Sequence, residues 1–124
     1  MKVISVLNQK GGAGKTTIAT HLATALRLAG HTVLLVDSDP QGSARDWAAV
    51  REDHPLSVVG MDRPTIERDL KSIAPVDFVI IDGAPPQAAD LAVSAIKASD
   101  FALIPPVQPS PPTTSGRPLT SLTS

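Results

Sequence analysis

A glycine-rich stretch near the N-terminus, "NQKGGAGKTT" at residues 8–17, is the feature that most constrains how this chain can fold. It follows an apolar run at residues 3–7, which predicts a buried strand, and it precedes a segment with apolar residues at helical spacing. A run of backbone N–H groups that ends at a helix N-terminus forms a cradle for phosphate groups. The order of strand, glycine-rich loop and helix therefore predicts a phosphate-binding loop.

The residue types within the loop suit this chemistry. The predicted nucleotide-binding residues are Gly11, Gly12, Ala13, Gly14, Lys15, Thr16 and Thr17. The glycines let the backbone bend and approach phosphate oxygens, Lys15 can reach the β- and γ-phosphates, and the Thr16 hydroxyl can coordinate Mg²⁺. Gln9 stands where the common pattern has glycine, so the loop is a variant. A simple glycine-rich turn with a helix cap is the alternative, but it leaves the order of the surrounding elements unexplained.

Strand and helix patterns alternate along the chain. Strands are expected at residues 3–7, 32–37, 56–60, 77–82 and 101–104, and helices at residues 16–29, 43–53, 65–73 and 90–98. The strand runs at 32–37 and 77–82 are apolar on both faces, which is typical of a parallel sheet covered by helices. The predicted fold class is therefore α/β, with a doubly wound, mostly parallel sheet and flanking helices.

Two carboxylates follow predicted strands on the same edge as the glycine-rich loop. Asp82 ends "DFVIID" and Asp37 opens "DSDPQGS". Ligands of such sheets bind beyond the carboxyl ends of the strands. Asp82 is placed to hold Mg²⁺ directly or through water, and Asp37 is placed to orient an attacking water or the waters of the metal.

Structural alternatives exist for both acidic segments. Asp82 and Gly83 together are common turn chemistry. The second segment is also suited to a strand-to-helix turn, in which Asp39 precedes a proline and Ser43 caps the helix.

Composition narrows the class of protein further. The chain has 124 residues, which suggests one domain, and no cysteine, which excludes disulfides and thiolate metal sites. The formal net charge of −1 gives no overall basic field for nucleic acid. No apolar run approaches the roughly 20 residues of a membrane helix. The N-terminus lacks the pattern of a signal peptide, so a cytoplasmic location is expected.

The two ends of the chain differ in character. Residues 1–104 carry the strand and helix patterns, so they form the predicted domain. Residues 105–124 contain six of the twelve prolines and no acidic residue. This proline-, serine- and threonine-rich tail is expected to be disordered.

Three motifs in order resemble a known family. The segment "KGGAGKTT" resembles the deviant Walker A motif of the ParA/MinD ATPases, "DSDPQGS" resembles their Walker A′ segment, and "FVIIDGAPP" resembles their Walker B motif. The opening "MKVISVLNQKGGAGKTT" and the later "IPPVQPSP" are similar to the small ParA proteins of plasmid and chromosome partition. The resemblance extends over about residues 1–111.

The resemblance implies an enzyme that binds ATP and Mg²⁺, forms a nucleotide-sandwich homodimer and hydrolyses ATP during DNA segregation. Lys10 would be the signature lysine, reaching across the dimer to the phosphates of the partner subunit. Lys15 and Thr16 would act within one subunit, with Asp37 near the attacking water and Asp82 near Mg²⁺. The ATP-bound dimer would bind DNA without sequence preference, and a ParB-type partner would stimulate hydrolysis. Nothing resembles the membrane helix of MinD, so no membrane partner is expected.

The chain departs from this family after "PVQPSP", where small ParA proteins start another helix and this chain instead has "PTTSGRPLTS". We therefore expect a C-terminally truncated ParA-type fold, with an exposed sheet edge and an uncovered apolar face. An out-of-frame end is our hypothesis for the tail. The missing part would supply further strands, much of the adenine pocket and the basic DNA surface. The alternatives are a nucleotide-binding fragment without turnover, or a family member acting on small molecules, such as a synthetase.

Overall fold

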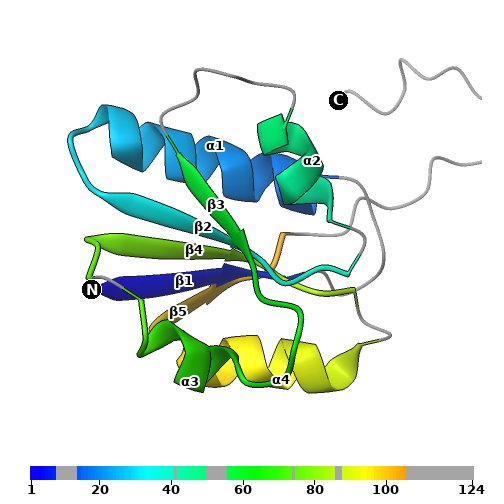
Figure 1. Cartoon of the computed structure of the whole chain (residues 1–124). Helices are drawn as coiled ribbons and strands as arrows, with labels where there is room; N and C mark the ends of the chain where they lie inside the picture. The colour runs from blue at the N-terminus through cyan, green and yellow to red at the C-terminus, as the bar shows by residue number, and fades with distance from the viewer. Residues whose placement is uncertain (8–13, 41, 50–55, 74, 86–87, 106–124) are drawn as a thin grey trace, which may run out of the picture.

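The computed structural model describes residues 1–7, 14–40, 42–49, 56–73, 75–85 and 88–105, which alternate strand and helix (Figure 1). The strands are β1 (Lys2–Val6), β2 (Val33–Asp37), β3 (Ser57–Gly60), β4 (Phe78–Asp82) and β5 (Phe101–Leu103). The helices are α1 (Lys15–Leu28), α2 (Ser43–Ala49), α3 (Ile66–Leu70) and α4 (Ala89–Ala98).

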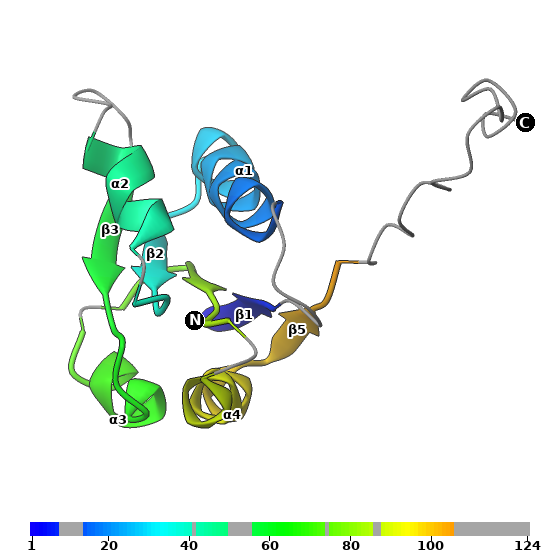
Figure 2. The same ribbon diagram turned by 90° about the vertical axis from the view of Figure 1, so that its right-hand side faces the viewer.

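The strands form one sheet in the order β3-β2-β4-β1-β5, and every pair is parallel. Helices α1 and α2 lie on one face of the sheet, while α3 and α4 lie on the other (Figures 1 and 2). The predicted fold class, a doubly wound α/β sheet with flanking helices, is confirmed. Because all strands are parallel, their carboxyl ends meet at one edge of the sheet.

The core consists of two apolar layers, one on each face of the sheet. Alternate residues of β4 divide between them, since side chains of a strand point to opposite faces in turn. Val79 and Ile81 pack in the layer that contains Ile66 and Leu70 of α3, while Ile80 packs in the layer beneath α1. This division explains why every position of the strand before Asp82 is apolar. Burial of each such side chain contributes about 1.5–3 kcal/mol.

The first helix begins directly after Gly14, whose φ of 111° lies in the left-handed region. A side chain at this position would be strained, so glycine suits the turn from the glycine-rich stretch into α1. The helix runs to Leu28, one residue short of the expected end. Residues 8–13, including Lys10 and the other predicted loop residues before Gly14, lie outside the described residues.

Strands β2 and β4 each begin one residue later than expected. Thr32 and Asp77 precede these strands, and their side chains bond to one another's backbone. Thr32 N–H donates to Asp77 Oδ2 over 3.0 Å, and Asp77 N–H donates to Thr32 Oγ1 over 2.8 Å. Backbone bonds are also present here, since the Thr32 carbonyl accepts from Phe78 N–H and the Asp77 carbonyl accepts from Lys2 N–H, each over 3.0 Å. The two polar residues thus tie the starts of β2 and β4 together just before the strands begin.

The remaining differences concern element lengths. Helix α3 spans only Ile66–Leu70, which is shorter than expected, and β5 ends at Leu103. Helix α2 is described as far as Ala49, and the rest of its expected range lies outside the described residues. Residues 50–55 and the predicted tail from residue 106 lie outside the described residues. Within the part of the chain that the structure describes, no helix has the length and apolar character needed to cross a membrane.

Candidate functional site

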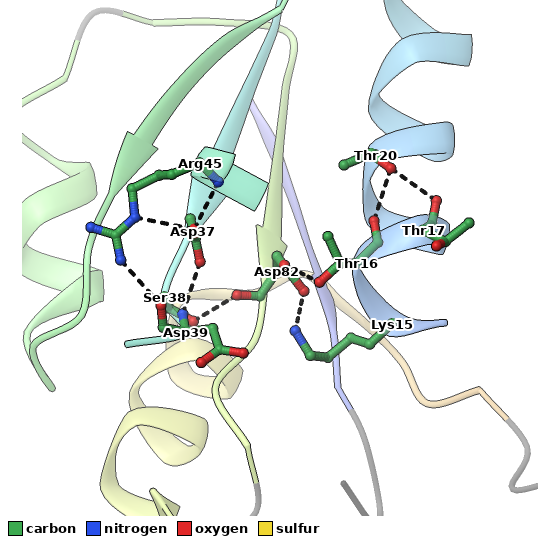
Figure 3. Close-up of polar contacts among 9 residues, drawn as sticks. All are labelled: Lys15, Thr16, Thr17, Thr20, Asp37, Ser38, Asp39, Arg45 and Asp82. Carbon is green, nitrogen blue, oxygen red and sulfur yellow. Dashed lines mark hydrogen bonds and ion pairs between the residues drawn. The ribbon is translucent and has the colours of Figure 1, made fainter. Parts of the chain in front are cut away.

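The carboxyl ends of β2 and β4 place the two predicted acidic residues side by side. Asp37 and Asp82 are register partners in this parallel pair, and both side chains are fully buried. The first turn of α1 lies next to the end of β4, which brings Lys15 and Thr16 to the same edge (Figure 3). The sequence predicted this convergence from the strand ends alone, and the structure shows it for these four residues.

Asp82 is bound through both of its oxygens by the start of α1. Lys15 Nζ donates to Asp82 Oδ1 in a buried ion pair, and Thr16 Oγ1 donates to Asp82 Oδ2 over 2.8 Å. Lys15 is only 5% exposed. The first turn of α1 and the end of β4 are therefore linked directly, through residues predicted to take part in nucleotide and Mg²⁺ binding.

Burial raises the pKa of the Asp82 carboxyl above its usual value of 3.8. Lys15 and Thr16 oppose this shift, and the neighbouring charge of Asp37 adds to it. The carboxylate thus pays a desolvation penalty that one lysine does not fully offset. Additional positive charge at this edge would favour the ionised form of Asp82, and a divalent cation would supply that charge.

The oxygen atoms at this edge are of the kind that Mg²⁺ prefers. Thr16 supplies a hydroxyl and Asp82 a carboxylate, with their oxygens 2.8 Å apart. The described residues hold no cluster of three or more histidine, cysteine or acidic side chains that could bind a metal alone. An ion here would therefore take few protein ligands and complete its shell with phosphate oxygens and water, as Mg²⁺ does with nucleotides. The residues fit this cation.

Gly83 holds the end of β4 against the end of β1. A Cβ at this position would lie 2.5 Å from Leu7 Cδ2 and 2.8 Å from the Val6 carbonyl oxygen. Its N–H donates to the Val6 carbonyl over 2.9 Å. Glycine is therefore required where Asp82 meets the strand from which the glycine-rich stretch departs.

Asp37 is bound by the turn that follows it. Its Oδ1 accepts from Asp39 N–H over 3.1 Å, and its Oδ2 accepts from both the backbone N–H and the Nε of Arg45, over 3.0 and 3.1 Å. Asp37 thus anchors the β2–α2 turn. The structural alternative for this segment predicted a turn here, but assigned it to Asp39 and Ser43. A carboxylate has about four acceptor sites, so three bonds leave one for a water. Its role with an attacking water stays a prediction.

Arg45 is a residue that sequence reasoning missed. Besides Asp37, its Nη2 donates to the Asp39 carbonyl over 3.1 Å and lies 4.0 Å from Asp62 Oδ2. The guanidinium also lies over Gly60, where an added Cβ would be 2.7 Å from Nη1. It therefore connects the loops after β2 and β3. The only available signal was a basic residue in the first turn of the helix that follows an acidic turn.

Ser38 was also missed. Its N–H and hydroxyl both donate to the Asp82 carbonyl, over 3.0 and 2.9 Å, and tie the ends of β2 and β4 together. Thr17, by contrast, is exposed, and its carbonyl accepts from Thr20 Oγ1 rather than from a site residue. The side chain of Ser43 lies outside the description, so its predicted capping role stays a prediction.

Comparison with known proteins identifies the class of domain. Residues 4–99 match the family described as the CobQ/CobB/MinD/ParA nucleotide binding domain. Because this match extends over most of the chain, the protein belongs to that family. The predicted resemblance to ParA/MinD proteins is confirmed at this level.

Individual relatives include partition and positioning proteins. The chain is 38% identical, over an alignment of 115 residues, to Maintenance of carboxysome distribution protein A of Gloeobacter kilaueensis. This alignment covers 89% of this chain and 50% of that protein. It is also 56% identical over 43 residues to Chromosome partitioning protein ParA of Caulobacter vibrioides. This alignment covers 35% of this chain and 16% of that protein. The chain thus spans about half the length, or less, of these relatives.

A solved structure shares the architecture. Cobyrinic acid a,c-diamide synthase from Mycobacterium smegmatis, with bound ADP and magnesium, superposes with a TM-score of 0.72 and 27% identity. The superposition includes 85% of this chain and 59% of the synthase chain. The same fold therefore occurs in a relative that holds a nucleotide and magnesium.

Proposed function

We propose that this chain binds ATP with Mg²⁺ at the carboxyl edge of β2 and β4, and hydrolyses it as a ParA-type ATPase in DNA partition. The observation that carries the proposal is the convergence of Lys15 and Thr16 on the two oxygens of Asp82. Membership of a nucleotide-binding family supports it, as does the ADP and magnesium in the Mycobacterium smegmatis synthase.

Each side chain at this edge has a proposed task. Thr16 and Asp82 would hold Mg²⁺, which supplies positive charge against the phosphate oxygens. The ammonium group of Lys15 has three donors, so it can contact a phosphate and still keep Asp82. Gly14 and Thr17 would complete the phosphate cradle together with residues 11–13. Asp37 would orient the attacking water through its remaining acceptor site.

The predicted dimer and its partners also stand as proposals. Lys10 would reach the phosphates of a second subunit in an ATP-dependent homodimer, and so neutralise charge that develops during phosphoryl transfer. Non-specific DNA and a ParB-type protein would be the partners, in the cytoplasm.

The first experiment measures ATP binding and turnover by the 124-residue chain with and without Mg²⁺. We expect Mg²⁺-dependent binding that Lys15→Ala weakens by about tenfold or more, since a hydrogen bond to a charged group contributes about 1.5–3 kcal/mol. Asp82→Asn should weaken the Mg²⁺ dependence, and Lys10→Ala should lower turnover. Lys97→Ala, at an exposed position of α4, is the matched control. A folded chain that binds no nucleotide would refute the proposal.

Binding without turnover would instead support the alternative of a nucleotide-binding fragment. In that case Lys15→Ala still weakens nucleotide binding, while Lys10→Ala leaves binding unchanged because no dimer forms. A thermal unfolding scan belongs beside both measurements, because loss of the cooperative transition would explain a negative result in any variant.

Maintenance of carboxysome distribution is a second candidate function. It is favoured by the 38% identity that extends over 89% of this chain to the carboxysome distribution protein, compared with 35% of the chain for the chromosome partition protein. Stimulation of ATP turnover by a DNA-bound ParB-type protein supports partition, and stimulation by a carboxysome component supports positioning. A reaction coupled to a small-molecule substrate would place the chain with the synthetases of the family.

A further inference from the structure

A groove lies between α3 and α4, on the face of the sheet opposite α1 (Figures 1 and 2). Its volume is about 660 Å³, and residues of both helices line it. The two walls are held together at its base, where Ile66 N–H donates to Ser94 Oγ over 3.0 Å. We propose that this groove binds a short acidic peptide segment of a partner protein, whose carboxylates pair with the cations of the groove.

Three exposed cations line the groove and have no carboxylate partner. They are Arg68 of α3, Lys71 directly after α3, and Lys97 in the last turn of α4. Within the described residues, no ion pair joins any of them to an acidic side chain. Arg45 and Arg63, by contrast, each lie within 4.0 Å of a carboxylate. Unpaired cations around one concave surface attract anionic groups.

Apolar side chains line the same groove. Ala89, Val93 and Lys97 follow one another at intervals of four residues, so they lie along one side of α4. Val93 is 49% exposed, and Pro64 lines the groove from the side of α3. A lining that is both apolar and positive suits a peptide helix that presents apolar and acidic side chains together. The ten residues of α4 extend over about 15 Å, which is enough for about three turns of such a helix.

The charges of the groove favour a peptide over a nucleic acid. Two carboxylates, Glu67 and Asp90, also line it, and they would repel a continuous row of phosphates. A peptide avoids this repulsion, because its carboxylates occupy only some positions. The formal net charge of −1 also gives the chain no overall basic field. The chain's own residues 106–124 contain no acidic residue, so they lack the charge that this groove attracts.

The test measures binding of a fluorescein-labelled synthetic peptide to the 124-residue protein in the absence of nucleotide. The peptide has about 12 residues, with leucine at helical spacing and glutamate at the flanking positions. We expect saturable binding by fluorescence anisotropy that weakens as salt is added, since salt screens exposed charges. In a nitrogen–proton correlation spectrum, the amide signals of α3 and α4 should shift and those of α1 should not. Because no nucleotide is present and the groove lies on the face opposite α1, the result does not depend on the proposed ATPase activity.

Charge reversal in the groove tests the assignment of the cations. Lys97→Glu and Arg68→Glu should each weaken peptide binding by about tenfold, because each sets like charges against one another. Arg27→Glu is the matched control, since Arg27 is an exposed cation in the last turn of α1 on the opposite face. Val93→Ala should weaken binding by about threefold through lost apolar contact. All four positions are exposed, so the variants are expected to fold, and circular dichroism checks this before the binding assay.

A second peptide, with lysine in place of every glutamate, is the ligand control. It should bind the wild-type protein about tenfold more weakly than the acidic peptide, and it should gain affinity for Lys97→Glu.

Five results would overturn the proposal. The first three are no saturable binding of the acidic peptide at about 1 mM, equal affinity of the two peptides, and equal affinity of Lys97→Glu, Arg68→Glu and Arg27→Glu for the acidic peptide. Displacement of the peptide by a DNA duplex of about 20 base pairs would assign the groove to nucleic acid. Shifts of the α3 and α4 signals that depend on protein concentration alone would assign it to a second copy of this chain.

Discussion

Strands β4 and β5 pair with the same neighbour, β1, on opposite sides and in the same parallel sense. Yet the residues of β4 from Val79 to Asp82 are fully buried, while every residue of β5 is exposed. The difference lies in the layers above and below the strands, since helices cover β4 on both faces. Pairing alone therefore aligns a strand, and packing against helices makes it part of the core.

The largest expected effect comes from truncating a buried side chain of β4. Ile80→Ala should lower the free energy of unfolding by about 4 kcal/mol, because Ile80 is fully buried and its removal leaves a cavity. Leu103→Ala, at 43% exposure on β5, should change it by only about 0.5 kcal/mol. Urea unfolding of the two variants measures the contrast. Equal losses would mean that β5 is packed as tightly as β4.

Removing the cation beside Asp82 should have the next largest effect. Lys15→Ala leaves the Asp82 carboxylate buried without its partner, which should cost about 3 kcal/mol near neutral pH. Lys97→Ala, on the surface of α4, is the control and should be near neutral.

The pH dependence of this variant follows from the direction of the pKa shift. Burial raises the pKa of Asp82 above 3.8, so the folded chain binds the proton more tightly than the unfolded chain. Stability therefore falls as pH rises from about 3.8 through the folded-state pKa. Lys15 opposes the shift, so Lys15→Ala should widen this window. Unfolding curves at several pH values would contradict this if the loss in Lys15→Ala were the same throughout.

Arg45 allows a smaller test at the ends of β2 and β3. Arg45→Ala should cost about 1 kcal/mol, since Asp37 keeps two backbone donors and the arginine side chain is 40% exposed. Arg45→Lys restores the charge without the fork of donors and should recover only part of the loss. Arg63→Ala, whose contact with Asp69 is 4.0 Å at an exposed position, is the control. A larger loss in Arg63→Ala would refute this assignment.

The smallest effect is expected at the amino-terminal ends of β2 and β4, where Asp77 contacts Thr32. The backbone N–H of Thr32 lowers the pKa of Asp77, with a smaller contribution from His31. This stabilisation is present above the unfolded-state pKa and is lost as pH falls through the lower folded-state pKa. Asp77→Ala should thus give a slight drop in the thermal midpoint at pH 7, and none at strongly acidic pH. A drop that persists in acid would show that the carboxylate charge is not its source.

Much of this fold was predictable because its signals are local. The alternation of strands and helices follows from apolar periodicity, and the position of Asp37, Asp82 and Lys15 at one edge follows from the parallel arrangement that this alternation imposes. The bonds of Arg45 and Ser38 were not predictable, since they depend on how the loops after β2 and β4 turn. Tertiary geometry also decided that Asp37 anchors a turn, a reading that the sequence had kept as an alternative.

Two short segments show where the sequence stops being sufficient. "FVII" at residues 78–81 and "FALI" at residues 101–104 are both apolar, and both were expected to form strands. By itself the sequence predicted that both segments are extended and that Asp37 and Asp82 lie at one edge of the sheet, together with the residues that begin the first helix. Only the tertiary structure decided that the first lies at the centre of the sheet and the second at its rim. The reason is physical, because burial depends on which neighbours cover a strand and not on the strand's own residues.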